Sequence, residues 1–75
     1  MKVIDLRFKE PGCTGHPVVR LNNRLRELNE DRVLIRFNLE DIPLKALELL
    51  IGRYGYRVDE VRNVNDYVEV VAIKA

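Results

Sequence analysis

The residues of this chain that could do chemistry gather in one short stretch, PGCTGHP, which runs from Pro11 to Pro17. It contains the only cysteine of the chain, Cys13, and the only histidine, His16. A cysteine thiolate is a nucleophile, and the positive end of a helix or nearby cations lower the thiol pKa from its ordinary value of about 8.5. The stretch therefore indicates a candidate thiol site, whose reactivity depends on the elements around it.

Several other chemistries are not supported by the sequence. One cysteine and one histidine cannot complete a zinc site, and a lone cysteine has no partner for an internal disulfide. No Ser/His/Asp set, glycine-rich phosphate loop or carboxylate pair stands out, so we expect no metal and no cofactor. Two ordinary interpretations stay open at this point: Cys13 as an inert small hydrophobic residue, and His16 as a helix-capping or surface residue.

The first half of the chain predicts a strand, a loop, a helix and a second strand. Residues 3–8 alternate between apolar and polar side chains, which is typical of a strand with one buried face. After a loop over residues 9–16, Pro17 suits the first turn of a helix, because its missing N–H is not needed there. The apolar residues then recur at helical spacing, at Val18, Leu21, Leu25 and Leu28. Alternation over residues 33–37 predicts the second strand.

The second half predicts another helix and two more strands. We expect Asp41 as the helix N-cap, Pro43 in its first turn and Gly55 as a left-handed stop. The stripe between them consists of Ala46, Leu47, Leu50, Ile51 and Tyr54. Strands over residues 56–61 and 67–73 flank a turn at residues 64–66. The alternation slips near Glu60. The last strand is apolar on both faces for much of its length, which predicts a central or covered position.

With 75 residues the chain is long enough for one small domain, which we place at residues 1–75. The element order βαβαββ, with right-handed crossovers, puts both helices on one face of a four-stranded mixed sheet. The predicted fold class is therefore a two-layer α/β sandwich. We expect one core shared by Ile4, Leu6, Val18, Leu21, Leu25, Ile35, Phe37, Leu47 and Leu50.

The charge balance gives little reason to expect a nucleic-acid partner. Thirteen basic and twelve acidic residues leave a formal net charge of +1. A nucleic-acid binder acting through Arg20, Arg24 and Arg26 on the first helix is the weakest alternative, because no aromatic side chains are interleaved with these arginines. No apolar run is long enough to span a bilayer, and charge interrupts the first ten residues too early for a signal peptide. We therefore expect a cytoplasmic domain without a membrane partner, whose oligomeric state stays open.

The sequence resembles the TusA/SirA family of small sulfur carriers over nearly its whole length. The resemblance rests on VIDLRFKEPGCTGHPVVRLNNRLREL, then VLIRF, EDIP and RYGYRVDEV. It implies two helices on one face of a four-stranded sheet. It also implies a cysteine before the first helix that carries sulfane sulfur as a persulfide. The donor would be a cysteine desulfurase or a rhodanese-like protein, and the acceptor would be another protein.

The motif of this chain departs from the family's Cys-Pro-x-Pro. Cys13 is followed by Thr14-Gly15-His16-Pro17; Pro17 matches the second proline, so Thr14 matches the family's cysteine position. Two interpretations follow. Either the loop brings Cys13 to the helix start and the carrier function is kept, or the chain is a TusA-like interaction or regulatory module without sulfur transfer. In the first, Cys13 is the catalytic thiol. The residues that would tune or support it are Lys9, Gly15, His16, Pro17 and Arg20.

Overall fold

The structure is a computed structural model, and it describes residues 2–7 and 16–75. The elements follow the predicted order βαβαββ. They are β1 (Lys2–Asp5), α1 (Pro17–Glu27), β2 (Arg32–Phe37), α2 (Leu44–Gly52), β3 (Tyr56–Val64) and β4 (Tyr67–Lys74). The predicted elements are thus all present, with differences at their ends.

The four strands form one mixed sheet in the order β1-β2-β4-β3. β1 pairs with β2 in parallel, whereas β4 pairs in antiparallel fashion with both β2 and β3. The apolar fourth strand is therefore central, as its two apolar faces predicted. β1 and β3 form the two edges of the sheet.

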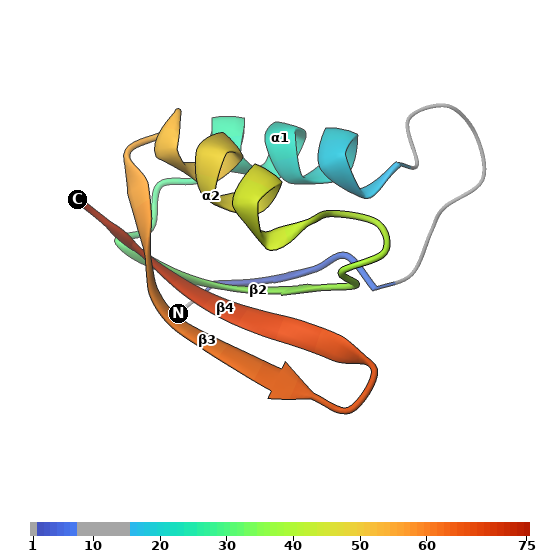
Figure 1. Ribbon diagram of the computed structural model, residues 1–75. Helices are drawn as coiled ribbons and strands as arrows, with labels where there is room; N and C mark the ends of the chain where they lie inside the picture. The colour runs from blue at the N-terminus through green and yellow to red at the C-terminus, as the bar shows by residue number, and fades with distance from the viewer. Residues whose placement is uncertain (1, 8–15) are drawn as a thin grey trace.

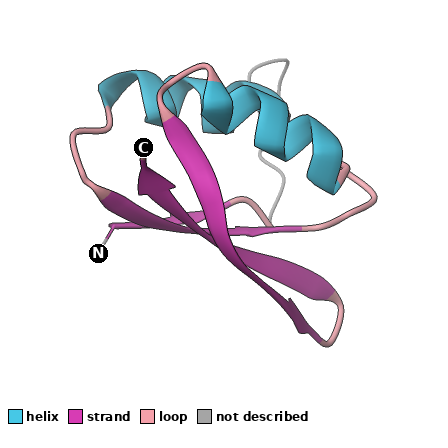
Figure 2. Cartoon of the chain, turned by 60° about the vertical axis from the view of Figure 1, so that its left-hand side comes forward, coloured by secondary structure: helices cyan, strands magenta, loops and turns pink. Residues whose placement is uncertain are grey.

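Both helices cover the same face of the sheet, and no described helix or strand covers the opposite face (Figures 1 and 2). This arrangement confirms the two-layer α/β sandwich. It follows from the chirality of the two crossovers, β1-α1-β2 and β2-α2-β3, since each connects parallel strands of one twisted sheet.

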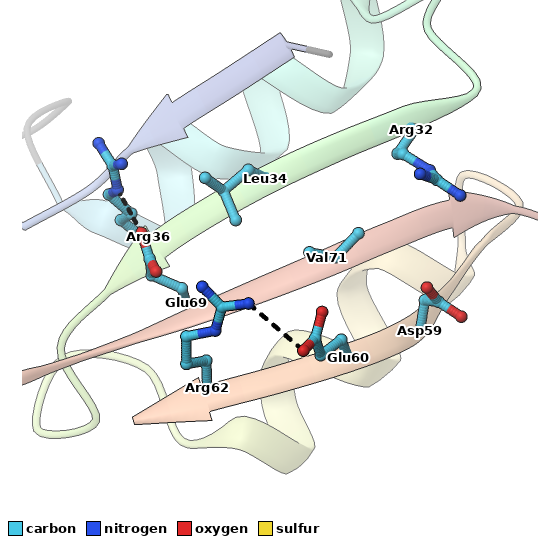
Figure 3. Close-up of a pocket in the computed structure, with 8 residues that line it drawn as sticks. All are labelled: Arg32, Leu34, Arg36, Asp59, Glu60, Arg62, Glu69 and Val71. Atoms are coloured by element: carbon cyan, nitrogen blue, oxygen red, sulfur yellow. Dashed lines mark hydrogen bonds and ion pairs between the residues drawn. The ribbon is translucent and has the colours of Figure 1, made fainter. Parts of the chain in front are cut away.

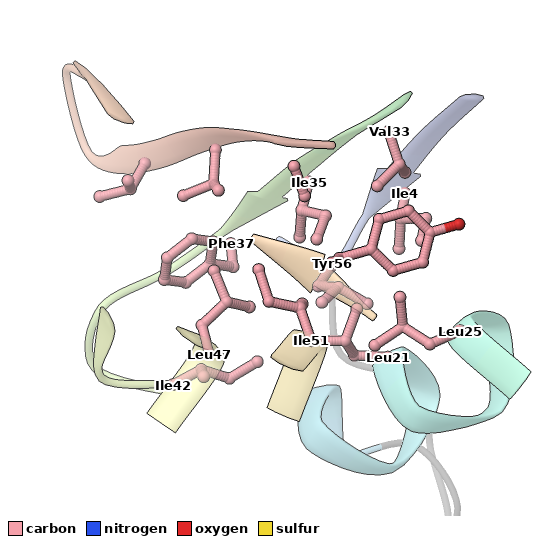
Figure 4. Packing of buried hydrophobic residues seen from close by; sticks show 14 residues of the cluster. Ile4, Leu21, Leu25, Val33, Ile35, Phe37, Ile42, Leu47, Ile51 and Tyr56 are labelled. Atoms are coloured by element: carbon pink, nitrogen blue, oxygen red, sulfur yellow. The ribbon is translucent and has the colours of Figure 1, made fainter. Parts of the chain in front are cut away.

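One core lies between the sheet and the helices (Figure 4). Its helical members are Leu21 and Leu25 from α1 and Leu47 and Ile51 from α2, all buried. The buried strand residues are Ile4, Val33, Ile35, Phe37, Tyr56, Val68, Val70 and Ala72, joined by Leu6 and Ile42 from the loops. Val18 does not belong to this core, because it is 37% exposed. Leu50 packs against the core while only partly buried.

The start of α2 differs from the prediction. Its N-cap is Pro43, and no side chain caps it. Asp41 instead belongs to a turn in which the carbonyl of Asn38 accepts hydrogen bonds from the N–H groups of Asp41 and Ile42. The carboxylate of Asp41 accepts a bond from the Asn38 amide. The prediction of Asp41 as the cap is wrong because this turn inserts two residues between it and the helix.

The ends of the strands also differ. β1 ends at Asp5, although the Leu6 N–H still donates to the carbonyl of Arg36. β3 continues to Val64, so that only Asn65 and Asp66 form the turn, and Asn65 has a φ of 51°. A β-bulge between Val58 and Glu60 accounts for the slip in the alternation. Gly55, with a φ of 85°, ends the turn after α2 as predicted.

Candidate thiol site at the start of helix α1

The structure describes three of the predicted site residues. His16, Pro17 and Arg20 all lie at the start of α1. Cys13, Lys9 and Gly15 lie outside the described residues. The geometry of the site is therefore built from the two ends of the 8–15 segment, which are Arg7 after β1 and His16 before α1.

His16 is the N-cap of α1. Its backbone is extended, with φ −64° and ψ 134°, and its Nδ1 accepts a hydrogen bond of 3.1 Å from the Val18 N–H. This bond satisfies one of the N–H groups that a helix start leaves without a partner in the helix. Pro17, buried in the first turn, needs no such acceptor. The His16 side chain is therefore a helix cap, which is one of the two ordinary roles that the sequence left open for it.

Arg20 ties the first turn of α1 to the end of β1. One of its terminal nitrogens donates a 3.3 Å hydrogen bond to the carbonyl of Asp5, and its N–H donates to the carbonyl of His16. The guanidinium thus lies beside the point at which the chain leaves the sheet. It adds positive charge beside the end of β1, whereas its predicted support of Cys13 concerns a residue outside the described part of the chain.

Arg7 and Asn38 hold the other end of the segment, and sequence reasoning gave neither of them a role. Arg7 makes two side-chain hydrogen bonds to the Asp5 carboxylate, of 2.9 and 2.7 Å, and its guanidinium lies 4.5 Å from the centre of the Tyr67 ring. Asn38 donates a 3.1 Å bond to the carbonyl of Arg7. The only signal was the spacing of Asp5 and Arg7, two residues apart and so on one face of an extended segment.

The described charges near the start of α1 are those of arginines and of one neutralised carboxylate. The first turn of α1 contains no acidic residue, and Arg24 and Arg26 lie in its last turn, where they complement the helix dipole. The nearest described carboxylate on β1, that of Asp5, is neutralised by Arg7. The Arg7 hydrogen bonds hold the pKa of Asp5 below its ordinary value of 3.8, although partial burial opposes them.

An apolar groove begins at the first turn of α1. It encloses about 250 Å³ between the helices and is lined by Val18, Ile42, Ala46, Leu49, Leu50 and Arg53. Val18 lines this groove instead of joining the core, because α1 turns that side chain toward α2 and not toward the sheet. Leu49, 65% exposed, forms the outer wall.

A second hollow, of about 400 Å³, lies on the open face of the sheet (Figure 3). Leu34 and Val71 form its floor, and charged side chains from β2, β3 and β4 surround it. Arg36 is paired with Glu69 at 2.7 Å, and Arg62 with Glu60 at 3.4 Å. Most of these charges are thus already neutralised within the sheet, and the hollow is separated from the start of α1 by the sheet itself.

Within the described residues no group of three or more histidine, cysteine, aspartate or glutamate side chains could hold a metal ion. In the same part of the chain, no helix is both long and apolar enough to cross a membrane. Comparison of the chain with protein-family models, with curated proteins and with solved structures finds no match. The site therefore has to be interpreted from its own geometry.

Proposed function

We propose that this chain is a sulfur carrier of the TusA/SirA type, which relays sulfane sulfur as a persulfide on Cys13. The observation that carries the proposal is the position of the chain's single thiol. Cys13 lies three residues before His16, the cap of a helix whose first turn contains no carboxylate. A thiolate and a persulfide are both anions, and a helix N-terminus stabilises negative charge.

The proposed relay consists of two exchanges at divalent sulfur. In the first, the Cys13 thiolate attacks the outer sulfur of a persulfide on the donor protein. The S–S bond of the donor breaks, the donor cysteine leaves as a thiolate, and a new S–S bond forms on Cys13. In the second, a nucleophile of the acceptor protein attacks the outer sulfur, and the Cys13 thiolate leaves. Neither exchange needs an external oxidant or reductant, because one S–S bond is replaced by another bond to the same sulfur.

The surroundings of α1 suit this role. Arg20 adds a cation beside the helix start, and the His16 cap fixes where the helix begins. The absence of a second cysteine also suits a carrier, because a resolving thiol in the same chain would displace the sulfur and form a disulfide. The partners of the proposed carrier are a donor, such as a cysteine desulfurase or a rhodanese-like protein, and an acceptor protein.

The test is the intact mass of the protein after incubation with a cysteine desulfurase and cysteine. We expect a gain of one sulfur atom, its loss on treatment with a reducing agent, and no gain in the Cys13→Ser variant. If the thiol stays unmodified with desulfurase and rhodanese-like donors alike, the chain is better described as a TusA-like interaction module without sulfur transfer.

A further inference from the structure

The two edges of the sheet differ in length. β1 has four residues, whereas β3 has nine, from Tyr56 to Val64. Five residues in a row, from Asp59 to Asn63, are exposed on β3, and Val61 among them is 41% exposed. A long exposed edge offers its backbone N–H and C=O groups to a further strand unless charge or a bulge prevents pairing.

The hairpin register shows which backbone groups of β3 point outward. Val64 pairs with Tyr67 across a two-residue turn, so this pair exchanges both of its backbone hydrogen bonds. Because hydrogen-bonded and non-hydrogen-bonded pairs alternate along an antiparallel ladder, Arg62 bonds inward to β4. Val61 and Asn63 then direct their N–H and C=O groups away from β4, toward the open edge.

The charges of β3 are complementary to those of a second, antiparallel copy of the same strand. A two-fold axis at Val61 places Val61 opposite itself as a hydrogen-bonded pair. Glu60 then faces the partner's Arg62, and Arg62 faces the partner's Glu60. These pairs lie on the open face of the sheet, to which both side chains project (Figure 3). Opposite charges at facing positions stabilise a strand pair.

The neighbouring registers lack this complementarity. A two-fold axis at Glu60 would set two glutamates opposite each other, and an axis at Arg62 would set two arginines opposite each other. Like charges at facing positions destabilise a strand pair. In the Val61 register the bulged Asp59 lies near the partner's Asn63, which carries no charge. The same side chains that would block other registers therefore specify this one.

We propose that β3 is a homodimer interface, in which two copies of the chain pair their β3 strands in antiparallel fashion about Val61. The pairing doubles the four-stranded sheet and leaves the helices of both copies on one side, since the two-fold axis is perpendicular to the sheet. β1 and the start of α1 belong to the opposite half of the sheet. The proposed dimer is therefore independent of the proposed sulfur chemistry.

Charge variants test the pairing by sedimentation over a range of protein concentrations. We expect a reversible dimer whose dissociation constant rises about tenfold or more in the Glu60→Arg variant, because two pairs of arginines then face each other. Asp59→Arg is the matched control: it changes the net charge equally but creates no like-charged pair, and should leave the dimer intact. The double variant Glu60→Arg/Arg62→Glu again places opposite charges at the facing positions, so it should dimerise like the wild type. A wild-type chain that stays monomeric, or equal weakening by Glu60→Arg and Asp59→Arg, would overturn the proposal.

A cysteine cross-link tests the register itself. In a Cys13→Ser background, Val61→Cys places two thiols in a facing pair, whose Cα atoms would be about 5.5 Å apart, within disulfide range. Asn63→Cys, also exposed and on the same strand, places them too far apart. Mild oxidation should cross-link the first variant and not the second. Equal cross-linking of both, or of neither, would contradict the Val61 register.

Discussion

The two helices of this small sandwich begin in different surroundings, although they lie side by side on one face of the sheet (Figure 1). α1 begins with a side-chain cap from His16, and Arg20 ties its first turn to β1. α2 begins at Pro43 without a side-chain cap, directly after the turn that contains Glu40 and Asp41.

Every α-helix carries a partial positive charge at its N-terminus. At α2 two acidic residues stand in the preceding turn, so an additional anion there would meet negative charge. The first turn of neither helix contains an acidic residue, but Arg20 lies beside the first turn of α1. The comparison teaches that helix dipoles alone do not distinguish the two sites. The described charges around them differ, since Glu40 and Asp41 precede α2 and Arg20 lies beside the start of α1.

The largest expected effect concerns the packing of both helices against the sheet. Leu21 of α1 and Leu47 of α2 are both fully buried against the sheet. Truncating either to alanine should lower the free energy of unfolding by about 2–5 kcal/mol, measured by denaturant titration. Leu49→Ala, at an exposed position of α2, is the control and should change it by about 0.5 kcal/mol or less. Losses that small at both buried positions would contradict the packing described here.

The next effect concerns the cap that only α1 has. His16→Ala removes the acceptor of the Val18 N–H and should cost about 0.5–2 kcal/mol of stability, again by denaturant titration. His16→Asn supplies another good N-cap acceptor and should recover most of that loss. If alanine and asparagine at this position are equally stable, the His16 hydrogen bond does not hold the helix start.

The element order and the fold class could be predicted because hydrophobic periodicity reports which side of each element is buried. The same signal predicted a central or covered place for β4 and the break in alternation near Glu60, which the structure shows to be a bulge. The exposure of Val18 could not be predicted, since helical spacing alone does not say whether the edge of a stripe faces the sheet or the neighbouring helix. The cap of α2 was missed because the Asn38 turn depends on backbone hydrogen bonds, which leave no periodic trace.

Only part of the candidate site could be predicted from local sequence patterns. His16 and Pro17 carry recognisable helix-start chemistry, and both lie where the sequence placed them. The contacts of Arg7, Asn38 and Arg20 that tie down β1 and α1 join residues distant in sequence, so a local pattern could not reveal them.

A smaller effect concerns Asp5, the carboxylate beside the α1 site. Because Arg7 holds its pKa below 3.8, the ionised form stabilises the folded state above the unfolded-state pKa, and this contribution is lost as the pH falls through the folded-state pKa. Asp5→Asn should therefore be less stable than the wild type near neutral pH. The difference should shrink below about pH 4. Denaturant unfolding of both proteins, measured from neutral pH to below about pH 4, checks this prediction. A stability difference between them that does not change with pH would exclude the proposed role of the Asp5 charge.

The most direct measurement compares sulfur loading at the two helix starts. Glu40 lies three residues before the cap Pro43, just as Cys13 lies three residues before the cap His16. A Cys13→Ser/Glu40→Cys variant therefore moves the thiol to the matching position of α2 and leaves Asp41 as the acidic residue beside it. After incubation with a cysteine desulfurase and cysteine, intact mass should show one added sulfur on the wild type and little or none on this variant. Equal loading of the two proteins, or a wild type that gains no sulfur, would contradict the assignment of Cys13 as a carrier thiol.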